Sequence, residues 1–260
     1  MTMTAPDDFH VARFVIEHQS GYRLEREERL VRDVAQRMGC EVQLASLSQM
    51  QRRRVVIDGG IVAIGRIPFI KAALMSVGRE LPPADPYPLA LRNMLHRDVR
   101  VRPLRGVLAT LDRTGEPFFI KPASRQKAFT GFVARDTQDF RLQGVSRSQD
   151  VWVASPAAFV SEWRVYVLTG EIFHVSHYEG DARVQLDMVK TQAAVAEYVE
   201  AGAPAGFAID FGVLADGNTA LVEANDGFSV GAYGDVPPEH YTRMLVCRWR
   251  QMAGNAAAPG

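Results

Sequence analysis

The chain has 260 residues, of which 47% are hydrophobic and 23% are charged, and this balance is ordinary for a globular protein of one large or two smaller domains. Its 30 basic and 30 acidic side chains cancel to a formal charge of zero, which excludes the excess of positive charge that attracts nucleic acid or an anionic membrane. Two cysteines provide neither a disulfide framework nor a zinc-ligand spacing, and no secretory signal or apolar run of membrane length is evident, so we expect a cytoplasmic protein.

The first part of the chain reads as a small β-α-β module. The apolar periodicity predicts strands at residues 12–17, 41–45, 55–57 and 61–64, with helices at residues 24–38 and 68–77. The last two strands are expected to flank a tight turn at Gly59-Gly60. The Pro-rich stretch at residues 81–88 cannot form a regular element, so we place a domain boundary there, with an N-terminal module over residues 1–86.

The second part of the chain, residues 87–250, reads as mainly β-structure with two helices. Strands are predicted near residues 106–109, 117–121, 132–133, 151–154, 162–168, 172–178, 208–214 and 219–227, and helices at residues 189–200 and 238–250. Thr169-Gly170 is the expected turn between the strands at 162–168 and 172–178. The small and polar residues 251–260 read as a frayed tail. We therefore expect an α/β (α+β) protein.

The last predicted hairpin carries three candidate metal ligands. An Asp216-Gly217 step between two apolar runs is a strong hairpin signal, and a loop of either two or four residues around it pairs Asp210 with Glu223. Two carboxylates in directly opposed positions destabilise a sheet unless a cation lies between them. Asn225 projects from the same face as Glu223, and it would add a neutral oxygen ligand to the two carboxylates.

An all-oxygen set of this kind suits Mg²⁺ or Mn²⁺ rather than zinc. The alternative is a solvated hairpin face whose carboxylates diverge into water. The other face of the first strand is entirely apolar, through Phe207, Ile209, Phe211 and Val213. This alternation indicates a well-ordered amphipathic sheet and favours the metal site.

Two lysines provide candidate phosphate ligands. Lys121 ends an apolar run and is followed by Pro122, which stops the strand and fixes the backbone just past the lysine. Lys127 follows in a polar loop with a glycine turn at Gly131, and this loop could fold over an anion. Two lysines and the nearby Arg125 suit the oxygens of a polyphosphate. The alternative interpretation of Lys121 is a lysine that simply caps a strand end.

An arginine in mid-strand is a further candidate. Period-two alternation puts Glu162, Arg164 and Tyr166 on one face of their predicted strand. An arginine beside a glutamate in this setting is either part of a structural ion pair or a functional group. If the strand crosses the cleft that holds Lys121, the guanidinium of Arg164 is placed to stabilise charge on a transferring phosphoryl group.

Taken in order, these motifs resemble the ATP-grasp superfamily. They comprise Phe119-Ile120-Lys121-Pro122, a second lysine, residues 161–170, Ile209-Asp210-Phe211, and Leu221-Val222-Glu223-Ala224-Asn225. The resemblance covers about residues 90–250 and looks most like the small bacterial and phage-associated ATP-grasp group that is named for its two arginines and lysine. It implies an ATP-grasp fold with a small preceding module, in which two lobes hold Mg-ATP between antiparallel sheets.

The resemblance also implies roles for single residues. The phosphates would be contacted by Lys121 and Lys127, and adenine by the backbone of a hinge that contains Trp152, Val153 and Ala154 and ends at Ser155. The ribose would lie near Glu162, and Mg²⁺ (or Mn²⁺) would be bound by Asp210, Glu223 and Asn225. The γ-phosphate or an acyl-phosphate would touch Arg164, so the implied catalytic residues are Arg164 and Lys127.

The activity that the resemblance implies is an ATP-dependent carboxylate–amine ligase. Such an enzyme activates a small-molecule or peptide carboxylate as an acyl-phosphate, passes the acyl group to an amine, and releases ADP and phosphate. Two alternatives stay open: a kinase that phosphorylates a hydroxyl in the same cleft, and a nucleotide-binding module without chemistry. The interval between Gly180 and Asp210 is short for a substrate loop, which leaves the acceptor open, and a homodimer is also left open.

Other motifs do not support a different class of protein. Residues 227–231 match the G-x-S-x-G pattern of a hydrolase nucleophile, but no helix is expected to follow directly. His174 and His177 are three positions apart on a predicted strand, so they face opposite sides and are not expected to share a metal. The sequence contains neither a P-loop nor a Rossmann glycine motif.

Overall fold

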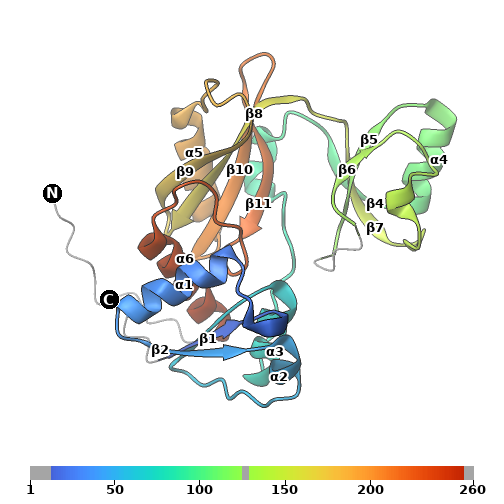
Figure 1. The fold of residues 1–260 in the computed structure, drawn as a ribbon. Coiled ribbons are helices and arrows are strands. Elements are labelled where there is room, and N and C mark those ends of the chain that lie inside the picture. The colour runs from blue at the N-terminus through green and yellow to red at the C-terminus, as the bar shows by residue number, and fades with distance from the viewer. Residues whose placement is uncertain (1–12, 125–128, 255–260) are drawn as a thin grey trace.

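The computed structural model describes residues 13–124 and 129–254 of the chain, and these form three parts (Figure 1). An N-terminal module packs against a large lobe, and a small lobe projects to one side of the large lobe. Each part is built on its own sheet. The predicted mixture of helices and sheets is confirmed.

The N-terminal module is a parallel sheet with helical crossovers. It contains β1 (Arg13–Glu17), α1 (Arg26–Arg37), β2 (Glu41–Ala45), α2 (Leu47–Gln51), β3 (Ile61–Ile64) and α3 (Ile67–Ser76). The strand predicted at residues 55–57 is wrong, because β3 pairs in parallel with β1 and needs no hairpin partner, and Val55 and Ile57 are buried within a loop. The prediction also misses α2, which begins with a capping box of Ser46 and Gln49.

The small lobe is an antiparallel sheet covered on one face by a helix. It contains β4 (Val99–Pro103), α4 (Leu104–Thr114), β5 (Phe118–Pro122), β6 (Phe132–Ala134) and β7 (Asp150–Ala154). The strand predicted at residues 106–109 is wrong, because these residues lie in α4. The side chains of Leu104, Val107, Leu108 and Leu111 recur at helical spacing and pack as one buried stripe against the sheet.

The large lobe is an antiparallel sheet between two helices. It contains β8 (Phe159–Leu168), β9 (Glu171–Gly180), α5 (Met188–Glu200), β10 (Gly206–Leu214), β11 (Thr219–Asp226) and α6 (Pro238–Ala253). The predicted turn at Thr169-Gly170 is confirmed, and both residues have the positive φ values, 48° and 88°, of a tight hairpin turn. Helix α6 extends into the predicted tail, because Met252 is buried, and Gly254, with a φ of 81°, follows its last residue as the C-cap.

The predicted pairing of Asp210 with Glu223 is confirmed, but it depends on a β-bulge. Near the turn Phe211 pairs with Leu221, and the register shifts between Asp210 and Phe211, so that Val222 is left without a partner. A one-residue slip turns every side chain of a strand to the opposite face. The bulge at Val222 therefore returns Glu223 to the face that carries Asp210.

The strand orders of the three sheets are β2-β1-β3, β4-β7-β5-β6 and β11-β10-β8-β9.

Three hydrophobic clusters form the cores of these parts. The first joins the N-terminal module to α6 and to one face of the large sheet, the second lies between the other face of that sheet and α5, and the third lies between the small sheet and α4. The N-terminal module thus shares its core with the large lobe. Among the described residues, no helix is both long enough and apolar enough to cross a membrane.

Candidate active site

The polar side chains of the candidate site lie on one face of the large sheet. Strand β10 is central, and its register sets Asp210 opposite Arg164 of β8 on one side and opposite Glu223 of β11 on the other. Asn225 lies two residues beyond Glu223 on the same strand and projects from the same face. The apolar residues that alternate with them pack against α5 on the opposite face. The site therefore lies on the face that α5 leaves uncovered.

Arg164 and Asp210 form a buried bidentate ion pair on this face. Nε of Arg164 donates to Oδ1 of Asp210, and Nη2 donates to Oδ2, both at 2.7 Å. Asp210 is 2% exposed and Arg164 is 6% exposed. Burial raises the pKa of Asp210 to about 6, although the guanidinium acts in the opposite direction, so the carboxylate is ionised at neutral pH. Burial is the largest single effect on the pKa of Arg164 and lowers it, but the hydrogen bonds to Asp210 and the charge of that carboxylate together raise the pKa.

Further contacts hold the guanidinium of Arg164 in one orientation. Nη1 donates to the carbonyl of Gly231 at 3.3 Å, and Cζ lies 4.4 Å from the ring centroid of Tyr233. The hydroxyl of Tyr166 donates to the same Gly231 carbonyl at 2.9 Å and accepts from the Tyr233 amide at 2.7 Å. The loop after β11 is thus tied to the sheet around Arg164, which leaves the guanidinium little freedom to reorient.

One contact crosses from the small lobe to the large lobe. Lys121, near the end of β5, donates from Nζ to Oε2 of Glu223 in β11. The two side chains are 26% and 25% exposed, so both reach solvent in the space between the lobes. An ammonium from one lobe and a carboxylate from the other therefore meet where the two sheets face each other.

The space around this contact is a cleft of about 530 Å³. Lys121 and Trp152 line it from the small lobe, Glu223 and Asn225 line it from β11, and the Pro-rich residues 82–86 form part of its wall. The indole Nε1 of Trp152 is buried and has no hydrogen-bond partner in the part of the chain that the structure describes. A cleft of this volume, with convergent polar groups, is typical of a small-molecule site.

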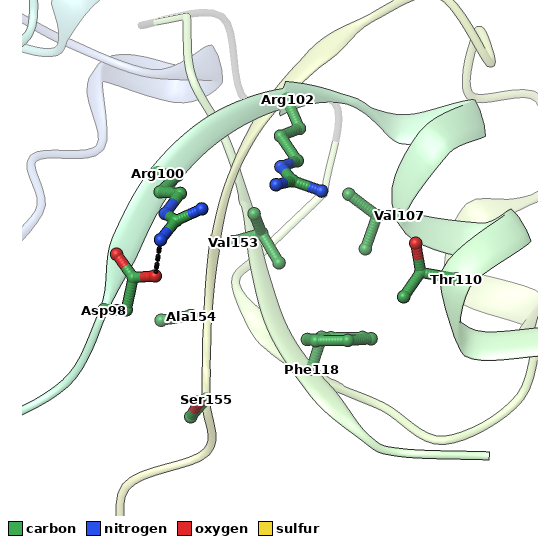
Figure 2. A pocket seen from close by; sticks show the side chains of 9 residues that line it. All are labelled: Asp98, Arg100, Arg102, Val107, Thr110, Phe118, Val153, Ala154 and Ser155. Carbon is green, nitrogen blue, oxygen red and sulfur yellow. Dashed lines mark ion pairs between the residues drawn. The ribbon is translucent and has the colours of Figure 1, made fainter. Parts of the chain in front are cut away.

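The predicted hinge segment lies between this cleft and a second pocket. Trp152 pairs with Lys121 and lines the cleft, whereas Val153, Ala154 and Ser155 line a pocket of about 160 Å³ on the side of the sheet that carries α4. Figure 2 shows this outer pocket, where Asp98 and Arg100 form an ion pair at 2.5 Å. The adjacent side chains of Trp152 and Val153 thus point to opposite sides of the small sheet, as alternation along a strand requires.

Of two further predicted site residues, Glu162 lies near the site and Lys127 is not described by the structure. Glu162 lies on the same strand and the same face as Arg164, and its Oε2 accepts a hydrogen bond of 2.7 Å from the hydroxyl of Tyr178. Lys127 lies outside the described residues, as does Arg125. The structure therefore brings Lys121, Arg164 and the three predicted metal ligands together, with Glu162 beside them.

The predicted metal ligands on this face are carboxylate and amide oxygens, which are the kind of ligand that Mg²⁺ prefers. Among the described residues, no three His, Cys, Asp or Glu side chains gather closely enough to bind a metal ion. The predicted set instead combines two carboxylates with the amide of Asn225, whose Nδ2 donates to Oδ2 of Asp210 at 3.1 Å and leaves its oxygen for another ligand. Both oxygens of Asp210 accept hydrogen bonds from Arg164, so the side-chain oxygens of Glu223 and Asn225 are the more accessible ligands for a metal ion.

Arg97 is a residue of this region that the sequence analysis misses. Its Nη1 donates to the carbonyl of Leu221 at 2.8 Å, and its Nη2 donates to the carbonyl of Val222 at 3.2 Å. Val222 is the bulged residue, so Arg97 holds the backbone that orients Glu223. A single arginine in an irregular segment shows no sequence pattern that would reveal this contact.

The competing motifs do not form sites of their own. His174 lies 2.9 Å from the hydroxyl of Ser176, whereas His177 packs edge-on against Trp163 with ring centroids 4.9 Å apart, so the two histidines do not converge. After the glycine loop at residues 227–231, the next helix begins only at Pro238. The expectations against a shared histidine metal and a nucleophile elbow therefore agree with the structure.

Sequence comparison identifies a family for this chain. The matching model is that of an ATP-grasp domain, family 2 of the clade named for two arginines and a lysine, and it covers residues 94–244, which is more than half of the chain. The match includes both sheets that face the cleft. Among curated proteins, none matches the sequence.

Solved structures share the fold at low sequence identity. A RimK-domain ATP-grasp protein from Sphaerobacter thermophilus is 15% identical with a TM-score of 0.55, and the match covers 91% of this chain and 99% of that one. N5-carboxyaminoimidazole synthetase from Staphylococcus aureus is 12% identical with a TM-score of 0.56, over 95% and 78% of the two chains. D-alanine–D-alanine ligase from Bacillus anthracis, complexed with ATP, is 14% identical with a TM-score of 0.54, over 93% and 97%. These similarities show the ATP-grasp fold.

Proposed function

The chain belongs to family 2 of the two-arginine-and-lysine clade of ATP-grasp domains, and on that basis we propose that it is a Mg-ATP-dependent carboxylate–amine ligase. The observation that carries the proposal is the meeting of Lys121 and Glu223 between the lobes, beside the fixed guanidinium of Arg164. Cationic side chains from two lobes suit the phosphates of a nucleoside triphosphate, and carboxylates from one sheet suit its metal ion. The ATP bound to the D-alanine–D-alanine ligase of the same fold supports this choice of nucleotide.

The nucleotide would occupy the cleft between the two lobes. Lys121 would exchange its contact with Glu223 for the phosphates, with Lys127 as the second phosphate ligand of the proposal. The backbone of residues 152–155 would hydrogen-bond adenine, and Glu162 would lie near the ribose. The cleft volume of about 530 Å³ supports this placement, because it is large enough for a ligand of this size.

The oxygens of Asp210, Glu223 and Asn225 would hold Mg²⁺ beside the phosphates. Bound there, the ion would offset the negative charge of the phosphates and of the group in transfer. Glu223 would become free to bind the metal ion when the ammonium of Lys121 contacts the phosphates instead. Asp210 has a second function, because its two hydrogen bonds hold Arg164 in position.

Arg164 would stabilise the charge that develops during transfer. A carboxylate oxygen of the substrate attacks the γ-phosphorus, the bond to ADP breaks, and an acyl-phosphate forms. The amine nitrogen then attacks the carbonyl carbon, phosphate leaves with its bridging oxygen, and the nitrogen loses a proton. A guanidinium that is already oriented stabilises negative charge without reorganisation during either step, and the contacts to Asp210, Gly231 and Tyr233 support this role.

The test is to supply the purified protein with Mg-ATP and a panel of amino acids and short peptides, with hydroxylamine as the trapping amine. A ligase forms ADP, free phosphate and a hydroxamate in equal amounts. A kinase instead leaves the phosphoryl group on a hydroxyl of its product, and a binding module forms neither product. Formation of a stable phosphoester without hydroxamate would contradict the proposal.

A further inference from the structure

A second cavity, of about 330 Å³, lies between the N-terminal module and the loop that follows β11. Its lining is rich in carboxylates and differs from that of the nucleotide cleft. The lining residues that matter here are Glu25, Glu27 and Glu28 at the start of α1, Arg66 before α3, and Ser229 and Gly231 in the loop. This cavity is named the acidic pocket below.

Glu28 is the residue that indicates a ligand. It is only 4% exposed, and its Oε2 is buried without a hydrogen-bond partner among the described residues. A buried carboxylate oxygen without a partner is costly, and proteins rarely keep one unless a ligand or an ion completes it. Burial raises the pKa of Glu28, and the neighbouring glutamates act in the same direction, so the pocket as it stands favours an incoming positive charge.

The cation that lines the pocket is already committed elsewhere. Nη2 of Arg66 donates to Oε1 of Glu17 at 2.6 Å, and its Nε donates to Oε2 at 3.2 Å, while Glu17 is 1% exposed. Arg66 therefore pairs with Glu17, and no cation of the described residues forms an ion pair with Glu27 or Glu28. Glu25 lies at the rim, where it pairs with Arg23 at 2.9 Å. The acidic pocket thus carries excess negative charge at its inner end.

The acidic pocket shares a wall with the catalytic face. Glu27 accepts a hydrogen bond of 2.9 Å from the amide of Ala232, which fixes it against the loop. Nη1 of Arg164 and Oε1 of Glu27 lie 3.4 Å and 3.7 Å from the point where a side chain at Gly231 would begin. The guanidinium and this carboxylate therefore face the same small space beside Gly231, so a ligand at Glu27 lies close to Arg164.

We propose that the acidic pocket binds the acceptor amine of the ligase as a cation, with its ammonium group at Glu27 and Glu28, and that one of these carboxylates takes a proton from the ammonium so that the neutral nitrogen can attack. This inference rests on the proposed function and names the class of acceptor: a compound with an ammonium group and no adjacent free carboxylate. A free α-amino acid would also bring its own carboxylate close to the glutamates of the pocket, and Arg66 is not available to neutralise that carboxylate. An amine or an amino-acid amide would bring only the positive charge.

The experiment compares three matched pairs of probes by calorimetry: alaninamide, leucinamide and lysinamide, each against its free amino acid. The protein is held with Mg²⁺ and a non-hydrolysable ATP analogue. At least one amide is expected to bind ten or more times as tightly as its free acid. Glu28→Gln should weaken that amide at least tenfold, because a charge-assisted hydrogen bond is lost, and should leave the affinity for the ATP analogue unchanged.

Two further variants keep the result interpretable. Glu27→Gln can still accept the Ala232 amide, so it removes the charge without removing that contact, and it should also weaken the amide. Glu41→Gln changes an exposed carboxylate of the same module, away from the pocket, and should change nothing. If Glu28→Gln fails to fold, the comparison of Glu27→Gln with Glu41→Gln decides the outcome.

The outcomes separate this inference from the proposed function. If the ATP analogue binds but no amide does, or if the free acids bind as tightly as the amides, the acidic pocket inference is overturned and the nucleotide site stands. If Glu27→Gln and Glu28→Gln both bind the amide as well as the unaltered protein does, the inference is also overturned. If an amide binds at Glu28 but no nucleotide binds, the proposed function fails and the pocket stands.

Discussion

Arg164 and Asp210 lie opposite each other on neighbouring strands that are far apart in the sequence, and two hydrogen bonds of 2.7 Å join the guanidinium to the carboxylate. The pair is buried, so solvent screens neither charge. It sets the orientation of the one arginine that the proposed mechanism places at the group in transfer. Changes to this pair should therefore alter the rate of the reaction more than the affinity for ATP.

Arg164→Lys keeps the positive charge but cannot reproduce the two-pronged contact with Asp210. We expect kcat to fall by roughly a hundredfold or more, with a much smaller change in the affinity for ATP, because the lost contact acts on charge that develops during transfer. Steady-state kinetics and calorimetry with an ATP analogue measure the two effects separately. Equal losses in kcat and in nucleotide affinity would indicate that Arg164 acts only in binding.

The pH dependence of the reaction should report on Asp210. Its pKa is raised to about 6 by burial, so lowering the pH through 6 protonates the carboxyl, removes one of the acceptors that orient Arg164, and should lower kcat/KM. The activity should be level above pH 7 and fall up to tenfold per unit below 6. Because the pKa of Asp210 is about 6 in the folded chain and 3.8 is its ordinary value, the folded chain binds the proton of Asp210 more tightly than the unfolded chain. The protonated carboxyl therefore adds to the free energy of unfolding at low pH, and this contribution is lost as the pH rises through 6.

A pH profile of kcat/KM measures this, because kcat/KM reports on the groups of the free enzyme before metal and nucleotide bind. The affinity for the ATP analogue in the presence of Mg²⁺ should weaken over the same range, because Asp210 is also a proposed ligand of the metal ion. An acidic limb centred near the ordinary pKa of an aspartate, 3.8, would contradict the assignment, because it would mean that the ion pair outweighs burial.

Lys121→Ala should weaken the binding of an ATP analogue by roughly tenfold to a hundredfold, because a charge-assisted contact to phosphate contributes about 1.5–3 kcal/mol. The substitution also leaves Glu223 without the ammonium that it contacts in this structure. Lys71→Ala, at an exposed position on α3, is the matched control and should bind the analogue normally. An unchanged dissociation constant for Lys121→Ala would return Lys121 to the role of a lysine at a strand end.

Glu223→Gln should abolish turnover and reduce the affinity for Mg²⁺ in the presence of the nucleotide, while the fold is retained. The glutamine keeps the size of the side chain and loses the charge that a hard cation requires. Binding of the ATP analogue should likewise depend on a divalent cation, since Glu223 and Asp210 would otherwise repel the phosphates. Full activity of Glu223→Gln, or tight nucleotide binding in EDTA, would contradict the metal assignment.

Much of the large lobe could be predicted from local patterns. The strands at Glu162–Leu168 and Ile172–Tyr178 alternate with period two and meet at Thr169-Gly170, so local sequence determines both the face of Arg164 and the turn. The pairing of Asp210 with Glu223 was also predictable, but not the way it arises. The turn signal alone does not reveal that Val222 forms a bulge, because the bulge is held by the distant side chain of Arg97.

Other features could not be predicted because they depend on distant contacts. A window of four apolar residues at 106–109 reads as a strand, and the helical spacing becomes visible only over Leu104 to Leu111. The ion pair of Arg164 with Asp210 requires the adjacency of β8 and β10, which a hairpin analysis does not give. The burial of the Glu28 oxygen could not be predicted, because the sequence of its helix is highly charged and indicates a helix exposed to solvent.

The central claim is that a carboxylate oxygen of the substrate attacks the γ-phosphate of ATP. The most direct test uses carboxylates labelled with ¹⁸O at both oxygens, supplied with Mg-ATP and the amine found to bind, with mass analysis of the phosphate that is released. The account predicts one ¹⁸O atom in the phosphate for each ADP formed, because the bridging oxygen of the acyl-phosphate comes from the substrate. Unlabelled phosphate, or a phosphoryl group retained on a hydroxyl of the product, would contradict it.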